Sequence, residues 1–164
     1  EKINNWTLSN IGKSQFTGWA SPPEIVIVDS EEPLLAQLAG KIEDLVKNDV
    51  SYGDIGIVYP QSSMANTLNN MPEKYIRRKL IPLDVTAVST DLSHSVIHGT
   101  AADFKGLERP IMIAVGFEGE IFAGNKRNIL YTALTRCNVG LFMFVDSSLL
   151  NALKQNERHA LSKK

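Results

Sequence analysis

The chain has 164 residues and a net charge of −1, from 17 lysine and arginine residues against 18 aspartate and glutamate residues. This length and a hydrophobic content of 43% are typical of one folded domain and exclude disordered and fibrous classes, and no apolar run reaches the roughly 18 residues of a membrane span. The near-zero charge also excludes a nucleic-acid binder that works by bulk positive charge, so any such contact must come from a local patch.

The amino-terminal third predicts an irregular arm followed by a strand and a helix. Residues 1–23 have no sustained hydrophobic period and are rich in Asn, Ser, Gly and Thr, so they are predicted to form a loosely ordered arm before a domain at 24–164. Glu24–Val28 is almost wholly apolar and β-branched, which is typical of a strand buried on both faces. The apolar residues of Pro33–Val46 have helical spacing and predict a helix.

The rest of the chain repeats this alternation of strands and helices. Further strands are predicted at Ile55–Tyr59, Val85–Val88, Ser95–Gly99, Ile111–Val115 and Gly140–Val145. Helices are predicted after Ser62, over Asn125–Arg136 and from Ser147 onward. Buried strands that alternate with helices predict an α/β fold, with a mostly parallel sheet between two helical layers. Such sheets bind ligands beyond the carboxyl ends of their strands, so the site is expected there.

Two segments near the amino terminus resemble parts of a nucleotide-binding site, but their context does not fit. A phosphate-binding P-loop needs a glycine five residues before Gly12-Lys13-Ser14, so that backbone N–H groups can wrap around the phosphates, and Thr7 occupies that position. The domain is therefore predicted to lack a P-loop of its own. Asp29 follows a predicted strand, as a magnesium-binding aspartate would, but is more simply a turn residue between strand and helix.

The cysteine and histidine residues indicate neither a disulfide nor a metal site. Cys137 is the single cysteine, so no internal disulfide can form, which fits a reducing compartment and a cytoplasmic location. His94, His98 and His159 show no metal-ligand spacing with Cys137 or with a pair of carboxylates. No metal bound by protein ligands is therefore expected.

Two segments in the second half combine residues with complementary chemistry. Thr100–Glu108, with the sequence TAADFKGLE, lies between two predicted strands, and Ile129–Arg136, with the sequence ILYTALTR, precedes the last predicted strand. Together they offer a turn at Gly106, a carboxylate that can accept from hydroxyl groups, and a guanidinium suited to phosphate oxygens.

These two segments resemble motifs V and VI of superfamily 1 helicases of the UvrD/Rep kind, and the resemblance covers roughly residues 24–145. In that family both motifs lie in the second, C-terminal RecA-like domain. The resemblance implies a RecA-like fold and a share in an ATP-dependent DNA helicase and ATPase. It also implies ATP with Mg²⁺ as the nucleotide, single-stranded DNA as a partner, and a preceding RecA-like domain of the same polypeptide.

The resemblance further implies a role for each matching residue. Arg136 matches the catalytic arginine finger that reaches the γ-phosphate of ATP. Glu108 matches the acidic residue that binds the nucleotide ribose, and Gly106 allows close approach of the backbone to the nucleotide. Thr100 matches a residue whose hydroxyl contacts a DNA phosphate, a contact that positions the strand without reading its sequence. Lys105 is a neighbour of these ligands and is assigned to the nucleic-acid side.

The chain departs from the family pattern in several places. Ala102 stands where many members have a histidine that contacts DNA, and the large insertion that often precedes motif V is absent, which indicates a compact variant. The P-loop, the magnesium ligands and an upstream arginine motif would lie before Glu1, so the isolated chain is predicted to be inactive.

The residues by themselves leave simpler readings open. Arg136 could favour a helix dipole, and Glu108 and Arg109 could be solvated turn residues. The whole chain could be a free-standing, non-catalytic RecA-like binding module, or an unrelated flavodoxin-like domain that would leave the paired motifs unexplained.

Overall fold

The computed structural model describes residues 23–72, 74–76, 79–83, 92–119, 129, 131–133, 135–152 and 155. Several sequence predictions lie outside the described residues: the arm up to residue 22, Gly12-Lys13-Ser14, the strand Val85–Val88, the start of the helix Asn125–Arg136, and His159.

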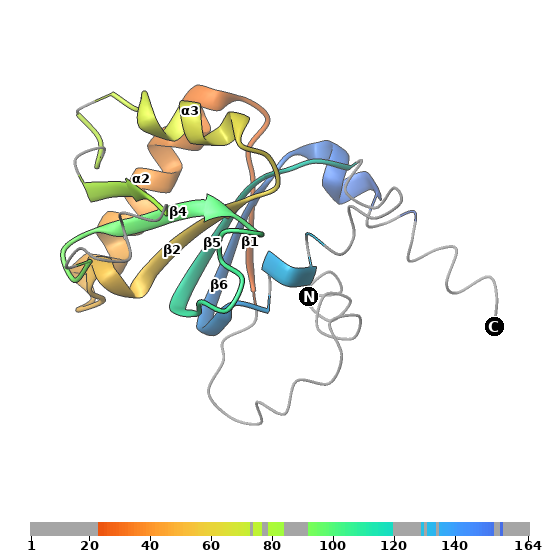
Figure 1. Ribbon diagram of the computed structural model, residues 1–164. Helices are drawn as coiled ribbons and strands as arrows, with labels where there is room; N and C mark the ends of the chain where they lie inside the picture. Colours follow the sequence, from red (N-terminus) through yellow and green to blue (C-terminus); the bar gives the residue numbers. More distant parts are fainter. Residues whose placement is uncertain are drawn as a thin grey trace.

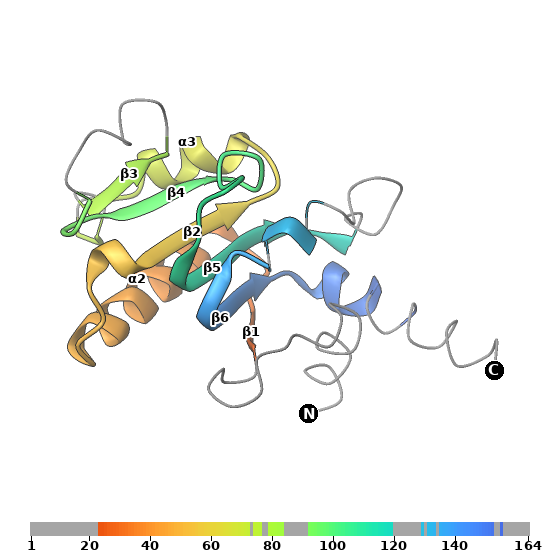
Figure 2. The same ribbon diagram turned by 60° about the horizontal axis from the view of Figure 1, so that its bottom comes forward.

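Six strands within the described residues form one sheet, in the order β1-β6-β5-β2-β4-β3 (Figures 1 and 2). They are β1 (Glu24–Ile27), β2 (Ile55–Tyr59), β3 (Leu80–Pro82), β4 (Val96–Thr100), β5 (Arg109–Phe117) and β6 (Cys137–Val145). Every neighbouring pair is parallel. The predicted α/β fold with a mostly parallel sheet is confirmed, and it is consistent with a RecA-like domain.

One face of the sheet is covered by helices α2 (Glu31–Lys47) and α3 (Ser63–Asn69), which lie together in Figure 1. A short 3-10 turn, η1 (Tyr52–Asp54), leads into β2. Side chains alternate along a strand, so Ile55, Ile57 and Tyr59 of β2 join the core under these helices. Helix α2 begins at Glu31 and has Pro33 in its first turn. A proline is tolerated there because the N–H that it lacks would have no helical partner in the first turn.

The other face is covered by two connections and the last helix. Phe104 of the turn 101–106, Ala133 of the helical residues 131–133 and Leu149 of the helical residues 147–152 pack in one cluster on this face. The alternate residues of the strands, such as Val58 of β2, supply the other half of this core. The three-layer arrangement with helices on both faces is therefore confirmed.

Strand β1 lies at the edge of the sheet and is only partly buried. It pairs with β6, and Ile27 is 49% exposed. Glu24 is exposed and forms a 2.7 Å ion pair with Lys41 of α2. The prediction of a strand buried on both faces is wrong, because an apolar β-branched run does not reveal whether a strand is central. Pro23 lacks an N–H for pairing, and the strand begins directly after it.

Several element boundaries also differ from the predictions. Strand β3 was not predicted, since its three residues are too short to show a period. Strands β5 and β6 begin two and three residues earlier than Ile111 and Gly140. Residues 135–136 form a turn rather than the end of a helix. None of the helices among the described residues has the length and apolar character that crossing a bilayer would require.

Candidate functional site

A pocket of about 470 Å³ lies between the turn after β4 and the helical residues before β6. It is lined by Pro60, Thr100, Ala101, Ala102, Lys105, Ile129, Thr132 and Arg136. Three of the predicted site residues, Thr100, Lys105 and Arg136, therefore share one pocket. Among the described residues, its lining contains two cations and two hydroxyl groups and no carboxylate, which suits an anionic ligand.

Hydrogen bonds between Thr100 and Asp103 shape the turn on one side of the pocket. The backbone N–H and the hydroxyl of Thr100 both donate to Asp103 Oδ2, at 2.7 and 2.8 Å. The N–H of Asp103 donates to Thr100 Oγ1 at 3.3 Å. This reciprocal pattern resembles the capping box that starts a helix, and here it starts the tight turn 101–106. Phe104 is fully buried and anchors the turn to the sheet.

Gly106 ends this turn in a left-handed backbone conformation, with φ of +84°. A Cβ atom at Gly106 would meet no atom of the described residues within 4 Å. The glycine is therefore required by the backbone angle and not by crowding within the chain. The free space beside it leaves room for the close approach that the resemblance implies.

Arg136 is the last residue before β6, and backbone hydrogen bonds hold it in place. Its N–H donates to the Ala133 carbonyl at 3.3 Å, and its carbonyl accepts from the Arg109 N–H at 3.1 Å. Within the part of the chain that the structure describes, the buried Nε of Arg136 has no hydrogen-bond partner. A buried guanidinium nitrogen without a partner is costly, so the geometry favours an anion beside it.

Glu108 lies outside the pocket, at the amino end of β5. Its Oε2 accepts a hydrogen bond from Asn138 Nδ2 of β6 at 3.1 Å. Thr100 is the last residue of β4 and lies at the carboxyl ends of the strands. Arg136 directly precedes the first residue of β6 and lies at the amino ends. Of these predicted site residues, Thr100 therefore lies at the carboxyl end of its strand, as expected, whereas Glu108 and Arg136 lie at the amino ends of β5 and β6.

The reason lies in the path of the two parallel crossovers. Each crossover must return from the carboxyl end of one strand to the amino end of the next. Both crossovers lie on the same face of the sheet. Residues 101–108 cross between β4 and β5, and the helical residues 131–133 belong to the crossing between β5 and β6. The pocket lies between them and extends along the face.

Arg109 is a residue whose position the sequence did not reveal, since it resembled a solvated turn residue. It is half-buried at the start of β5, beside an irregularity in pairing between Arg109 and Ile111. Its Nη1 donates to the Glu108 carbonyl at 3.3 Å, and its buried Nε has no partner among the described residues. An irregularity of this kind redirects a side chain, and the Arg109 stem lies near Gly56 and Phe104.

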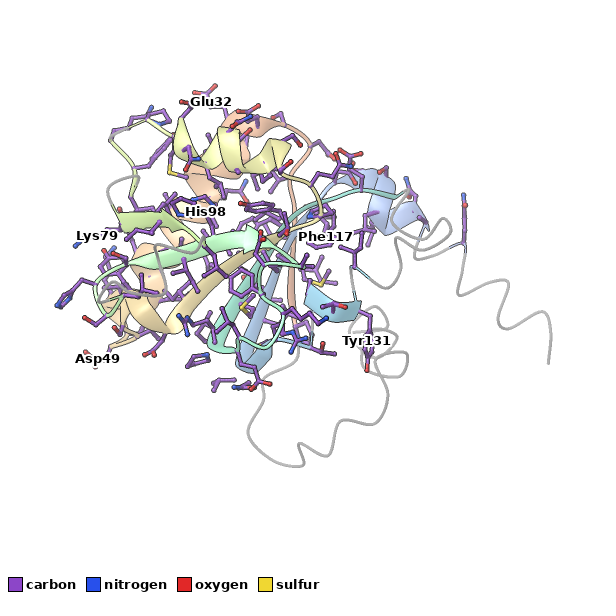
Figure 3. The ribbon with its side chains drawn as sticks, in the orientation of Figure 1. Glu32, Asp49, Lys79, His98, Phe117 and Tyr131 are labelled. Atoms are coloured by element: carbon purple, nitrogen blue, oxygen red, sulfur yellow. The ribbon has the colours of Figure 1, made fainter. Side chains whose placement is uncertain are left out.

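A buried pair that involves Tyr59, on the face of the sheet under α2 and α3, was also missed. Tyr59 Oη and His98 Nδ1 are hydrogen-bonded at 3.1 Å. His98, which is labelled in Figure 3, is completely buried. Burial lowers the pKa of His98 to about 4, so its ring is neutral near pH 7. Burial, together with the negative charge of Asp103, raises the pKa of Tyr59 to about 12. A histidine in a strand gives no sequence signal of such a partner.

Asp29 caps a distant helix instead of binding a cation. Its carboxylate accepts from the N–H and the hydroxyl of Ser147 at 2.8 and 2.9 Å, which lowers the pKa of Asp29. Among the residues that the structure describes, no group of three or more His, Cys, Asp or Glu side chains could hold a metal ion.

Comparison with known proteins finds solved structures of similar fold. No family model matches the sequence, and a search of curated proteins finds no match. Among solved structures, the C-terminal domain of a possible DNA helicase from Lactobacillus plantarum WCFS1 is similar, with a TM-score of 0.64 and 19% sequence identity. The likeness covers 93% of this chain and 89% of that chain. At this identity it establishes the fold.

Proposed function

We propose that this chain is the C-terminal RecA-like half of an ATP-dependent DNA helicase of the UvrD/Rep kind in superfamily 1. The observation that carries the proposal is the pocket that gathers Thr100, Lys105 and Arg136 without a carboxylate in its lining. A structure of similar fold is described as the C-terminal domain of a possible DNA helicase, which supports the same reading. A cytoplasmic location is part of the proposal.

The nucleotide end of the site would consist of Arg136, Glu108 and Gly106. Arg136 and Glu108 directly precede β6 and β5, and the N–H of Arg109 donates to the carbonyl of Arg136, so the two segments lie side by side. The partnerless Nε of Arg136 suits a phosphate oxygen, and the Glu108 carboxylate suits a ribose hydroxyl. Arg136 would act as an arginine finger on the γ-phosphate, while the magnesium ligands and the P-loop would come from a preceding RecA-like domain.

The nucleic-acid end of the site would consist of Thr100 and Lys105. Thr100 is the last residue of β4, at the carboxyl ends of the strands. Arg136 and Glu108 lie at the amino ends. The shared pocket would then extend from a DNA phosphate at its Thr100 end to the nucleotide at its Arg136 end. Contacts of a hydroxyl and an ammonium group to phosphates position single-stranded DNA without reading its sequence.

The test is hydrolysis of ATP by the polypeptide that carries this chain together with its preceding domain. Arg136→Ala should lower DNA-stimulated turnover by about a thousandfold or more while ATP binding persists, because an arginine finger acts on the transition state. Arg136→Lys is the matched control, since it keeps the charge and loses the planar fork; it should remain strongly impaired. Turnover near that of the unmodified protein in Arg136→Ala would refute the finger.

The isolated 164-residue chain serves as a second control. It should hydrolyse no ATP, because half of the proposed site would be missing. Hydrolysis by the isolated chain would contradict the proposed division of the site. A gene without a preceding ATPase domain would favour a non-catalytic RecA-like binding module.

A further inference from the structure

Asp103 occupies the two hydrogen-bond donors that Thr100 would offer to a phosphate. A single oxygen, Asp103 Oδ2, accepts from the backbone N–H of Thr100 at 2.7 Å and from its hydroxyl at 2.8 Å. A threonine hydroxyl has one proton to donate, and phosphate oxygens at neutral pH are acceptors. Thr100 therefore cannot donate to a phosphate while Asp103 holds both of its protons.

The charge of Asp103 adds to this competition. Two negative groups that approach the same pair of donors repel each other, so phosphate and carboxylate exclude each other at this position. Asp103 is exposed, and no ion pair to Asp103 is found among the described residues. Lys105 and Arg136 thus leave the carboxylate unneutralised, although both line the neighbouring pocket.

Gly99, which has no side chain, leaves space for the Asp103 carboxylate beside Thr100. A Cβ atom at Gly99 would lie 3.1 Å from Asp103 Cβ and 3.2 Å from Asp103 Oδ2. A larger residue at position 99 would therefore require the Asp103 side chain to shift by a few tenths of an ångström. Asp103 is exposed to solvent, so its carboxylate can turn away from Thr100 without disturbing the core.

We infer that Asp103 sets the affinity of the nucleic-acid site, by competing with a DNA phosphate for the N–H and the hydroxyl of Thr100. This inference rests on the proposed function. When single-stranded DNA binds, the Asp103 side chain turns into solvent and a phosphate oxygen takes the place of Oδ2. Asp103 is thus a residue that acts through Thr100.

The test is the affinity of the full-length protein for a fluorescein-labelled oligothymidylate at low salt, measured by fluorescence anisotropy. Asp103→Asn removes the charge and keeps the shape, and it should bind the oligonucleotide about fivefold more tightly. If Asp103 only supported the turn, as a capping residue does, the same substitution would weaken binding. The sign of the change separates the two roles.

Two controls isolate the contact. Glu43→Gln, on the exposed side of α2, changes the net charge by the same amount and should leave the affinity unchanged. In a Thr100→Val background, the gain in oligonucleotide affinity from Asp103→Asn should be smaller. The hydroxyl for which Asp103 and the phosphate compete is then absent. An undiminished gain in that background would contradict competition through Thr100.

The outcomes distinguish this inference from the proposed function. Unchanged or weaker binding by Asp103→Asn, with clear binding by the unmodified protein, overturns the inference and leaves the proposed function standing. Absence of binding by every variant at low salt overturns both. If thermal unfolding shows that Asp103→Asn does not fold, Asp103→Ser carries the same prediction, because its hydroxyl can accept from Thr100 without charge.

Discussion

Gly106 holds a backbone conformation that other residues adopt only at a cost, with φ of +84°. Gly106→Ala should lower the free energy of unfolding by about 1 to 2 kcal/mol, because a Cβ atom in the left-handed region meets the following carbonyl oxygen. Denaturant unfolding of both proteins measures the difference. The substitution should also weaken nucleotide binding, since the turn from Lys105 to Glu108 would change its course.

Gly40 in α2 is the matched control for this prediction. A Cβ atom at Gly40 would meet no atom within 4 Å, and Gly40 has helical backbone angles. Gly40→Ala should therefore raise the free energy of unfolding by about 0.5 to 1 kcal/mol. Loss of stability in both variants, or in neither, would contradict the role of the left-handed angle at Gly106.

At the residue scale, the sequence predicted part of the candidate site. Thr100 and Lys105 were expected at a nucleic-acid site and Arg136 at a nucleotide site, and the structure brings all three into the lining of one pocket. Glu108 was expected beside the nucleotide with Arg136, and it bonds to Asn138 outside the pocket. The hydrogen bonds from Thr100 to Asp103 were not predicted, because a pattern of residue types does not show which neighbour accepts from a given donor.

At the scale of elements, the turn 101–106 depends on one aromatic anchor. Phe104 is fully buried against the sheet, among residues such as Met112 of β5. Its N–H donates to the Thr100 carbonyl at 3.3 Å, so the anchor is directly linked to the site residue. The position of Thr100 and Lys105 over the pocket therefore follows from the burial of Phe104.

Phe104→Ala should lower the free energy of unfolding by about 3 to 5 kcal/mol, because it leaves a cavity under the turn. It should also weaken oligonucleotide binding under conditions where the variant remains folded. Phe117→Ala is the matched control, since Phe117 is equally buried in the same core but lies outside the pocket. Similar loss of binding in both variants would show that stability alone governs the site.

Strands differ in how far their sequences predict their place in the sheet. Ile55–Tyr59 was predicted as a buried strand, and β2 is buried throughout. Glu24–Val28 has a similar pattern, yet β1 is an edge strand with Ile27 half exposed. Residue types report the preference for an extended conformation, whereas the neighbours of a strand depend on topology.

At the scale of the whole molecule, the buried ring of His98 links stability to pH. Its pKa is lowered from 6.5 to about 4, so the unfolded chain binds a proton at a higher pH than the folded chain. The stability from a neutral His98 is fully present above pH 6.5 and is lost as the pH falls toward 4. Between about pH 7 and about pH 5 this loss should reach about 2 kcal/mol.

Denaturant unfolding at several pH values measures this dependence. His98→Gln is the comparison, because glutamine can still bond to Tyr59 and does not titrate in this range. The variant should lose less stability than the unmodified protein over the same range of pH. Identical slopes for the two proteins would show that other groups cause the acid sensitivity.

The sequence alone determined the alternation of strands and helices and the three-layer parallel sheet, because periodicity and residue type are local properties. Its resemblance to motifs V and VI singled out Thr100, Lys105 and Arg136 as candidate site residues. Tertiary structure decided the edge position of β1, the separation of Glu108 from the pocket, and the bond between Asp103 and Thr100. These depend on which strands become neighbours and how each crossover returns across the sheet. Such information belongs to the packed chain, where segments far apart in sequence meet.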